Sequence, residues 1–239
     1  MYISMLFIYL LSTSPLDNEL LEAVKMNKIE TVKTLLQKGA NPEASDEMGF
    51  CALTYASGFG FVEIAVLLVE KGARVDLPSK DGRTPLLIAC TNGELKIIEL
   101  LTKKGADVNK KEYLGGGTPL MSAILHEHTE AVKLLIRKGA SVNHKLNDGT
   151  TPLMLAARNF QIVRILLENK AEINAKDNEG ITTLMIACEN GFTKVAGLLI
   201  KYGADIKLKD KSGLSAFDYA KVNNHIEIMK LLKGIPADK

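Results

Sequence analysis

The stretch DGRTPLLIACTNGELKIIELLTKKGADVN, from Asp81 to Asn109, predicts the fold of the chain. Its Asp81-Gly82 pair is typical of a tight turn, and Thr84-Pro85 is typical of a helix start, with Thr as the N-cap and Pro in the first helical position. Asn92-Gly93 can adopt the left-handed geometry that ends a helix. Apolar residues between these signals recur at helical spacing. We therefore expect a turn followed by two short helices.

The same pattern recurs along the chain. From Cys51 through Thr84, the helix-start slot repeats in steps of 33, 34, 33, 31 and 33 residues. The glycine that ends the second helix recurs with it, at Gly39, Gly72, Gly105, Gly139 and Gly203. Each helix is too short to be stable alone, so its apolar side needs a neighbouring copy. A fixed period near 33 residues indicates a stacked solenoid.

Period, motif and helix order together resemble those of ankyrin-repeat proteins over residues 16–236. The resemblance implies an all-α ankyrin-repeat solenoid with about seven helix-turn-helix units linked by β-hairpin-like loops, in a single domain. The units are expected at residues 16–45, 46–78, 79–110, 111–145, 146–176, 177–209 and 210–236. The family's usual His after Thr-Pro-Leu is absent, and residues such as Leu87 and Met121 replace it. Contacts between units are therefore expected to be more apolar.

The units at 146–176 and 16–45 both depart from the pattern. The unit at 146–176 is two residues short between its helices, near Asn159, and Lys170 replaces the helix-ending glycine. A non-Gly residue in the left-handed geometry costs about 1 kcal/mol, so we expect this unit to be the least stable. The unit at 16–45 has no Thr-Pro-Leu, and Asp17 is its expected N-cap.

Residues 1–15 form an apolar N-terminal segment that begins MYISMLFIYLL and that Pro15 separates from the repeats. It is too short to span a bilayer, which takes about 20 residues. It lacks the basic start and the small-residue cleavage site of a secretion signal. A capping helix on the first unit is the alternative interpretation. We expect a cytoplasmic protein, or a secreted one if residues 1–14 are a signal peptide.

The sequence contains no catalytic motif of the GxSxG, HExxH or Walker type. The glycines at 115–117 lack the context of a phosphate-binding loop. His126 and His128 are two residues apart, so they do not share a helix face, and no cysteine or carboxylate pattern completes a zinc site. We therefore predict no enzyme, no cofactor, no metal and no small-molecule substrate.

The three cysteines, Cys51, Cys90 and Cys188, occupy core-facing positions in different units and form no CxxC pair. We interpret them as small buried apolar residues, a usage that suits a reducing compartment.

The resemblance implies a scaffold or adaptor that binds a protein partner through its hairpin tips and the concave face of its first helices. A preformed surface loses little conformational entropy on binding. Apolar and aromatic side chains gather at such positions in the N-terminal half of the chain. The predicted partner-binding residues are Met48, Phe50, Phe59, Arg83, Asn92, Tyr113, Leu114, Leu125 and His126. The protein is expected to be monomeric.

Three alternatives stay open. The first is an exported ankyrin-repeat protein with an extracellular or host-cell target. The second is binding of nucleic acid or acidic lipid by the basic residues Lys103, Lys104, Lys110, Lys111, Arg137, Lys138, His144 and Lys145. The formal net charge of +2 is scattered, so nucleic acid is not the favoured partner. The third is a modification that the resemblance implies, hydroxylation of Asn109 and Asn174 in the hairpins.

Overall fold

The computed structural model describes residues 14–234. Within them the chain forms fourteen helices, and no strand is present beyond the isolated bridges Ser45–Cys51 and Lys209–Ser215. The segment 1–13, which includes the expected signal or cap, and residues 235–239 lie outside the described residues.

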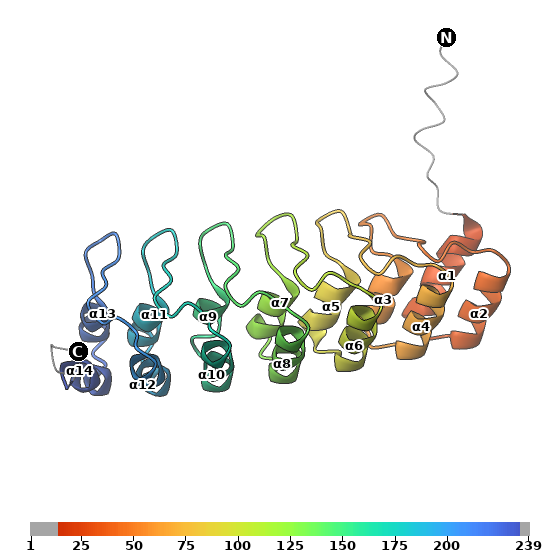
Figure 1. Cartoon of the computed structure of the whole chain (residues 1–239). Coiled ribbons are helices and arrows are strands. Elements are labelled where there is room, and N and C mark those ends of the chain that lie inside the picture. Colours follow the sequence, from red (N-terminus) through yellow and green to blue (C-terminus); the bar gives the residue numbers. More distant parts are fainter. Residues whose placement is uncertain (1–13, 235–239) are drawn as a thin grey trace, which may run out of the picture. The chain divides into compact units, whose positions relative to one another are not determined.

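The helices form seven consecutive pairs (Figure 1). The first helices of the pairs are α1 (Pro15–Lys25), α3 (Ala52–Gly58), α5 (Pro85–Asn92), α7 (Pro119–Leu125), α9 (Pro152–Leu155), α11 (Thr183–Glu189) and α13 (Ala216–Val222). The second helices are α2 (Ile29–Gln37), α4 (Val62–Glu70), α6 (Leu95–Lys103), α8 (Thr129–Arg137), α10 (Phe160–Glu168), α12 (Thr193–Lys201) and α14 (Ile226–Lys233). The expected helix order and number of units are therefore confirmed. We call the pairs repeats 1 to 7.

The repeats group into two compact units, which meet between Asp107 and Val108. In the first unit, α1, α3 and α5 pack side by side as one layer, and α2, α4 and α6 form a second layer. In the second unit the odd-numbered helices α7 to α13 and the even-numbered helices α8 to α14 form the same two layers. A single continuous domain over residues 16–236 stays a prediction.

The local signals of the third repeat act as expected. The Thr84 hydroxyl accepts a hydrogen bond from the Leu87 amide at 3.2 Å, and Pro85 begins α5. Gly93 and Gly105 have φ angles of 74° and 89°, in the left-handed region. The core between the layers is apolar, and Leu87 and Met121 are buried at the position of the absent His.

One expectation about the first helix is wrong. Ser14, not Asp17, is the N-cap of α1, and Pro15 occupies the first helical position. Asp17 is the third helical residue, where it completes a capping box with Ser14 and accepts a hydrogen bond from the Asn41 amide at 2.7 Å. This bond connects the first turn of α1 to the hairpin that follows α2.

The two-residue loss in repeat 5 also falls elsewhere than expected. It shortens the first helix, α9, to four residues, whereas the first helices of the neighbouring repeats have seven. The Asn159 side chain then caps α10 by accepting from the Ile162 amide at 3.1 Å. Lys170 adopts the left-handed geometry with a φ of 66°, as predicted.

Candidate functional site

Repeat 2 contains four aromatic rings in sequence, which we call the aromatic stripe: Phe50, Tyr55, Phe59 and Phe61. Phe50 precedes α3, Tyr55 lies within it, and Phe59 and Phe61 belong to the turn before α4. Successive ring centroids are 6.2, 6.3 and 5.4 Å apart. These distances are typical of favourable aromatic pairs. The stripe therefore runs from the hairpin, along α3, to the inter-helix turn.

Two cations of the chain lie against the stripe. The Lys25 ammonium is 4.8 Å from the centroid of Tyr55, and the Arg83 guanidinium is 4.9 Å from that of Phe50. Both distances lie within the range of a cation–π interaction. Each cation also has its own carboxylate, Glu22 at 2.9 Å from Lys25 and Asp81 at 2.5 Å from Arg83. Both cations that contact the stripe are therefore paired with a carboxylate.

A short hydrogen bond fixes the hairpin to the stripe. The Tyr55 hydroxyl donates to Asp46 Oδ2 at 2.5 Å, while Asp46 Oδ1 accepts from the amides of Met48 and Phe50. Desolvation, followed by the bond to the Asp46 carboxylate, raises the pKa of Tyr55 to about 12. Asp46 thus orients both the loop that presents Met48 and the central ring of the stripe.

Five of the nine predicted partner-binding residues lie in the first unit. Met48 and Phe59 are exposed, with 55% and 52% of their surface accessible. Phe50 and Arg83 are half-buried because they pack against each other. Asn92 is exposed, but its side-chain amide donates to the Gly58 carbonyl at 2.7 Å, so it also links repeats 2 and 3.

The other four lie in the second unit. Tyr113 and Leu114 are exposed on the loop before α7, at 62% and 80%. Leu125 and His126 are exposed at the end of α7, and the His126 ring stacks on that of His128 with centroids 6.1 Å apart. The two histidines therefore meet across the turn, although they would not share a face of one helix.

The glycine-rich loop before α7 is held by hydrogen bonds. The Glu112 amide donates to the Gly117 carbonyl at 3.0 Å, and the Asn147 side chain donates to the Leu114 carbonyl at 3.1 Å. His144 Nε2 lies 2.9 Å from the Gly116 oxygen. Tyr113 and Leu114 are thus presented by a loop with a defined backbone.

Both candidate hydroxylation sites are exposed hairpin residues that bond to the next repeat. The side chain of Asn109 accepts from the Ser141 amide at 2.8 Å and donates to the Gly139 carbonyl at 3.2 Å. Asn174 accepts from the Asp205 amide at 2.9 Å. These two residues therefore link successive hairpins within the second unit.

The sequence missed three residues of the candidate surface. Tyr55 and Phe61 belong to the stripe, and Met26, the C-cap of α1, is 57% exposed beside it. The spacing of four residues between Tyr55 and Phe59 is the signal that could have placed both rings on the same side of the predicted helix.

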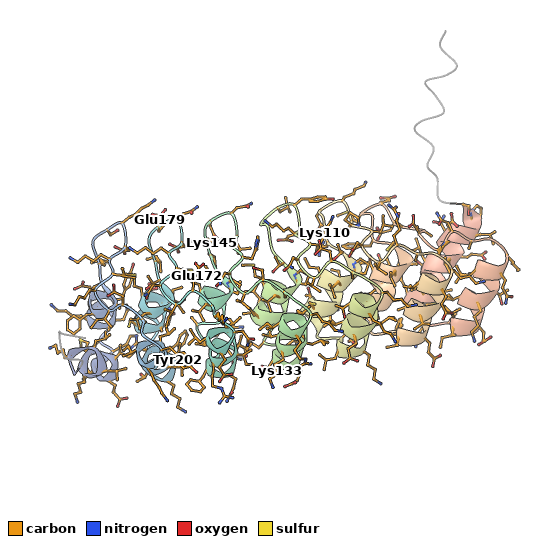
Figure 2. All side chains as sticks on the ribbon, viewed as in Figure 1. Lys110, Lys133, Lys145, Glu172, Glu179 and Tyr202 are labelled. Carbon is orange, nitrogen blue, oxygen red and sulfur yellow. The ribbon has the colours of Figure 1, made fainter. Side chains whose placement is uncertain are left out.

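Some lysines of the predicted basic set have structural partners. In the second unit the Lys145 ammonium donates to the Lys176 carbonyl at 3.0 Å, and Lys176 donates in turn to the Lys209 carbonyl at 2.7 Å. Figure 2 shows Lys145 with Lys110 among the hairpins. These bonds connect neighbouring hairpins, so they account for Lys145 without an anionic ligand.

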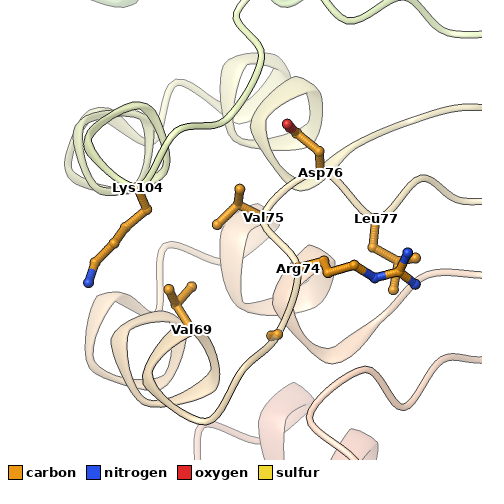
Figure 3. Close-up of a pocket in the computed structure, with 7 residues that line it drawn as sticks. Val69, Arg74, Val75, Asp76, Leu77 and Lys104 are labelled. Carbon is orange, nitrogen blue, oxygen red and sulfur yellow. The ribbon is translucent and has the colours of Figure 1, made fainter.

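An open groove of about 500 Å³ lies in the first unit, between α4, the following hairpin and the end of α6 (Figure 3). Its lining consists of Val69, Ala73, Arg74, Val75, Asp76, Leu77 and Lys104. Arg74 is paired with Glu43 at 2.6 Å, and Asp76 accepts from the Asp107 amide at 3.0 Å. The groove contains none of the predicted partner-binding residues, although Lys104 belongs to the predicted basic set, and two of its charged groups are already bonded.

Metal ligands do not cluster in the described part of the chain: residues 14–234 contain no group of three or more His, Cys, Asp and Glu side chains that could hold a metal ion. Cys51, Cys90 and Cys188 are buried free thiols, and burial raises the pKa of each. For Cys188 the value is about 12. Among the described helices, none is both long and apolar enough to cross a membrane.

Comparison with known proteins places these observations in a family. A family model described as ankyrin repeats (3 copies) matches residues 20–112, 110–177 and 161–239. No curated protein matches the chain. Among solved structures, the chain is similar to the human ASB11 ankyrin repeat domain, with 29% identity, a TM-score of 0.81, and coverage of 94% of this chain and 100% of that one. It is also similar to the ankyrin repeat domain of Bcl-3, which is described as a unique member of the IkappaB protein family. There the identity is 25%, the TM-score is 0.81, and the match covers 90% of this chain and 98% of that one.

Proposed function

Because the chain belongs to the ankyrin-repeat family, whose repeats are general protein–protein interaction modules, we propose that it is a scaffold or adaptor that holds a protein partner. The proposed contact surface consists of the hairpin tips and the first helices. In the first unit, Met48, Phe50, Phe59, Arg83 and Asn92 would contact the partner. In the second unit, Tyr113, Leu114, Leu125 and His126 would do so.

The aromatic stripe is the observation that supports this proposal most. Phe59 is half exposed although it belongs to a chain of packed rings, and Met48 is exposed in the hairpin at the other end of the stripe. Apolar patches of this kind, with polar groups around them, mark interaction sites. Aromatic and Arg side chains also contribute most of the binding energy in measured interfaces.

Rigidity is the second support. Phe59 is stacked between Tyr55 and Phe61, and Asp46 fixes both the hairpin and Tyr55. A side chain that is already ordered loses little conformational entropy when a partner covers it, which would otherwise cost about 0.5–1.5 kcal/mol. The surface is therefore suited to binding without rearrangement.

The test is a binding assay with single substitutions. The partner is first captured from native lysate and identified, and its affinity for the purified chain is then measured. We expect Phe59→Ala and Tyr113→Ala each to weaken binding by about 1–3 kcal/mol. Tyr113 is exposed, so Tyr113→Ala should change the free energy of unfolding little. Phe59→Ala also removes ring contacts with Tyr55 and Phe61, so its stability is measured beside its affinity.

Tyr202→Ala is the matched control, because Tyr202 is an exposed aromatic residue at the end of a second helix, α12 (Figure 2). Arg158 is less suitable as a control, since it pairs with Glu127 at 2.7 Å and donates to the Leu125 carbonyl. If Tyr202→Ala weakens binding as much as the two other substitutions, the proposed surface is wrong.

Cytoplasmic localisation and a monomeric state are part of the same proposal. Three buried free thiols suit a reducing compartment. No observation in the described residues favours an exported protein or a binder of nucleic acid or acidic lipid over a protein-binding module.

A further inference from the structure

Two rings of the aromatic stripe are each covered by a cation of the chain. Lys25 lies over the Tyr55 ring and Arg83 over the Phe50 ring, and each of these cations is also paired with a carboxylate. In both arrangements the ring face and the carboxylate attract the same positive charge. The stripe therefore shows twice how this surface holds a cation.

The third ring, that of Phe59, has a carboxylate beside it but no cation. Glu94 is the N-cap residue of α6, and its side chain reaches back to repeat 2, where a Cβ atom added to Gly60 would lie 2.7 Å from Glu94 Cδ. Gly60 directly follows Phe59, whose side chain is 52% exposed. Among the cations of residues 14–234, none lies over the Phe59 ring and none pairs with the Glu94 carboxylate.

The position of Glu94 in the repeat determines where its side chain lies. His225, the N-cap residue of α14, occupies the same position, and its Nδ1 would lie 2.9 Å from a Cβ atom on Gly191 in the turn of repeat 6. In both places the N-cap side chain of a second helix crosses to the turn of the preceding repeat. The stacking of the repeats therefore sets the location of the Glu94 carboxylate.

Asn92 adds a second acceptor to this edge. Its Nδ2 donates to the Gly58 carbonyl at 2.7 Å, which holds the side-chain amide next to the residue that precedes Phe59. With Nδ2 engaged, Oδ1 is the acceptor that the exposed Asn92 presents. Lys96, which is also exposed, is two residues from Glu94 and so lies on another face of α6. Repeat 3 thus places a carboxylate and an amide oxygen beside the exposed ring.

We propose that Phe59, Glu94 and Asn92 form a binding site for an arginine side chain of the protein partner, which we call the arginine site. A planar guanidinium stacks on a ring face, as that of Arg83 does on Phe50, while its N–H groups donate to the carboxylate and the amide oxygen. A lysine ammonium carries the same charge but lacks the plane and the fork of donors. The inference rests on the proposed function and names the group by which the partner is recognised.

The first experiment uses the full-length chain labelled with 4-fluorophenylalanine and, as probe, N-acetyl-arginine methylamide. The fluorine signal of Phe59 is assigned through its loss in Phe59→Leu, and that of Phe160 in the second unit serves as internal control. We expect the probe to shift the Phe59 signal. N-acetyl-citrulline methylamide, which is neutral and similar in shape, and the corresponding lysine probe should each bind about threefold more weakly at equal ionic strength.

Two matched substitutions locate the contact. Glu94→Gln keeps the shape and removes the charge, and Glu94 makes no side-chain capping bond, so α6 should stay intact. Glu99→Gln removes the same charge from an exposed position of the same helix. We expect Glu94→Gln to weaken binding of the arginine probe about threefold and Glu99→Gln to leave it unchanged. Equal binding of the arginine, citrulline and lysine probes, or equal effects of the two substitutions, would overturn the proposal.

Partner binding separates this inference from the proposed function. Once the partner is captured, Glu94→Gln should weaken its binding about tenfold, because the pair is then desolvated. The effect of Glu94→Gln should vanish when the contacting arginine of the partner is changed to glutamine. Weaker partner binding of Phe59→Ala, with Glu94→Gln equal to wild type, would refute the arginine site and leave the proposed surface standing. Unchanged partner binding in Phe59→Ala and Tyr113→Ala would refute the proposed surface, and binding of the arginine probe would then still establish a site for arginine.

Discussion

Lys170→Gly should stabilise repeat 5. Lys170 has a φ of 66°, and the equivalent Gly105, Gly139 and Gly203 have φ angles of 89° to 91°. A Cβ atom at any of these glycines would meet no atom within 4 Å, so the cost of a side chain there comes from the backbone geometry. The left-handed geometry costs a non-Gly residue about 1–2 kcal/mol in the folded state. Against this, glycine gives the unfolded chain more conformational entropy, which lowers the free energy of unfolding by about 0.4–1 kcal/mol.

The net expectation for Lys170→Gly is a gain of about 0.5–1 kcal/mol in the free energy of unfolding. The Asn143 side chain donates to the Lys170 carbonyl at 3.2 Å, and this bond to the backbone survives the substitution. Because the chain has two compact units, local hydrogen exchange of residues 160–175 is a better measure than one global transition. Slower exchange is expected there in the variant.

Gly139→Lys in the preceding repeat is the reciprocal control, and it should cost about the same amount that Lys170→Gly gains. A calorimetric scan gives a second readout, with a midpoint shift of about 1–4 °C in opposite directions for the two variants. The reasoning is refuted if Gly139→Lys is neutral while Lys170→Gly accelerates exchange.

Three further predictions concern Tyr55, the cysteines and the hairpin asparagines. Tyr55→Phe removes the hydrogen bond to Asp46 and should lower the free energy of unfolding by about 1 kcal/mol in urea titrations; a stability equal to wild type would show that the bond contributes nothing. The Tyr55 pKa of about 12 is raised above its ordinary value near 10, so this contribution is complete below about pH 10 and lost as the pH rises through 12. Absorbance of the phenolate follows that titration. The native thiols should resist alkylation at neutral pH because burial raises their pKa, and rapid modification of Cys90 in the folded chain would contradict its burial. Peptides containing Asn109 or Asn174 should show one added oxygen after expression with an asparaginyl hydroxylase, and unchanged masses would end that proposal.

The repeats could be predicted from sequence because their signals are local. Thr84 and Pro85 start a helix wherever they occur together, and Gly105 ends one, without help from distant contacts. The start of α1 carries a local signal of the same kind, with Ser14 as the N-cap, Pro15 in the first helical position and Asp17 completing the capping box, so the assignment of Asp17 as the cap overlooked it. The bond from the Asn41 amide to Asp17, between residues 24 positions apart, could not be predicted from these local signals. The shortening of α9 to four residues was also not predicted.

The candidate site could be predicted only in part, because the bonds that an exposed side chain makes to other repeats depend on the fold. Exposure of Met48 and Phe59 follows from their positions in the repeat, and both are exposed. Position alone does not show whether an exposed side chain is also bonded within the chain. The sequence places Asn92 at a helix end and among the partner-binding residues, but it does not show that the Asn92 side chain donates to the Gly58 carbonyl of the preceding repeat.

The partial burial of Phe50 decides which substitution can report on binding. Its ring packs against Tyr55 and under the Arg83 guanidinium, so Phe50→Ala would remove packing within the repeat as well as any contact with a partner. Phe59 leaves half of its surface open while its other side contacts Tyr55 and Phe61. In a repeat protein, stability is approximately a sum over each repeat and its nearest neighbours. A loss of affinity in Phe59→Ala at unchanged stability of repeats 1 to 3 therefore measures contact with the partner, whereas the same loss in Phe50→Ala does not distinguish contact from packing.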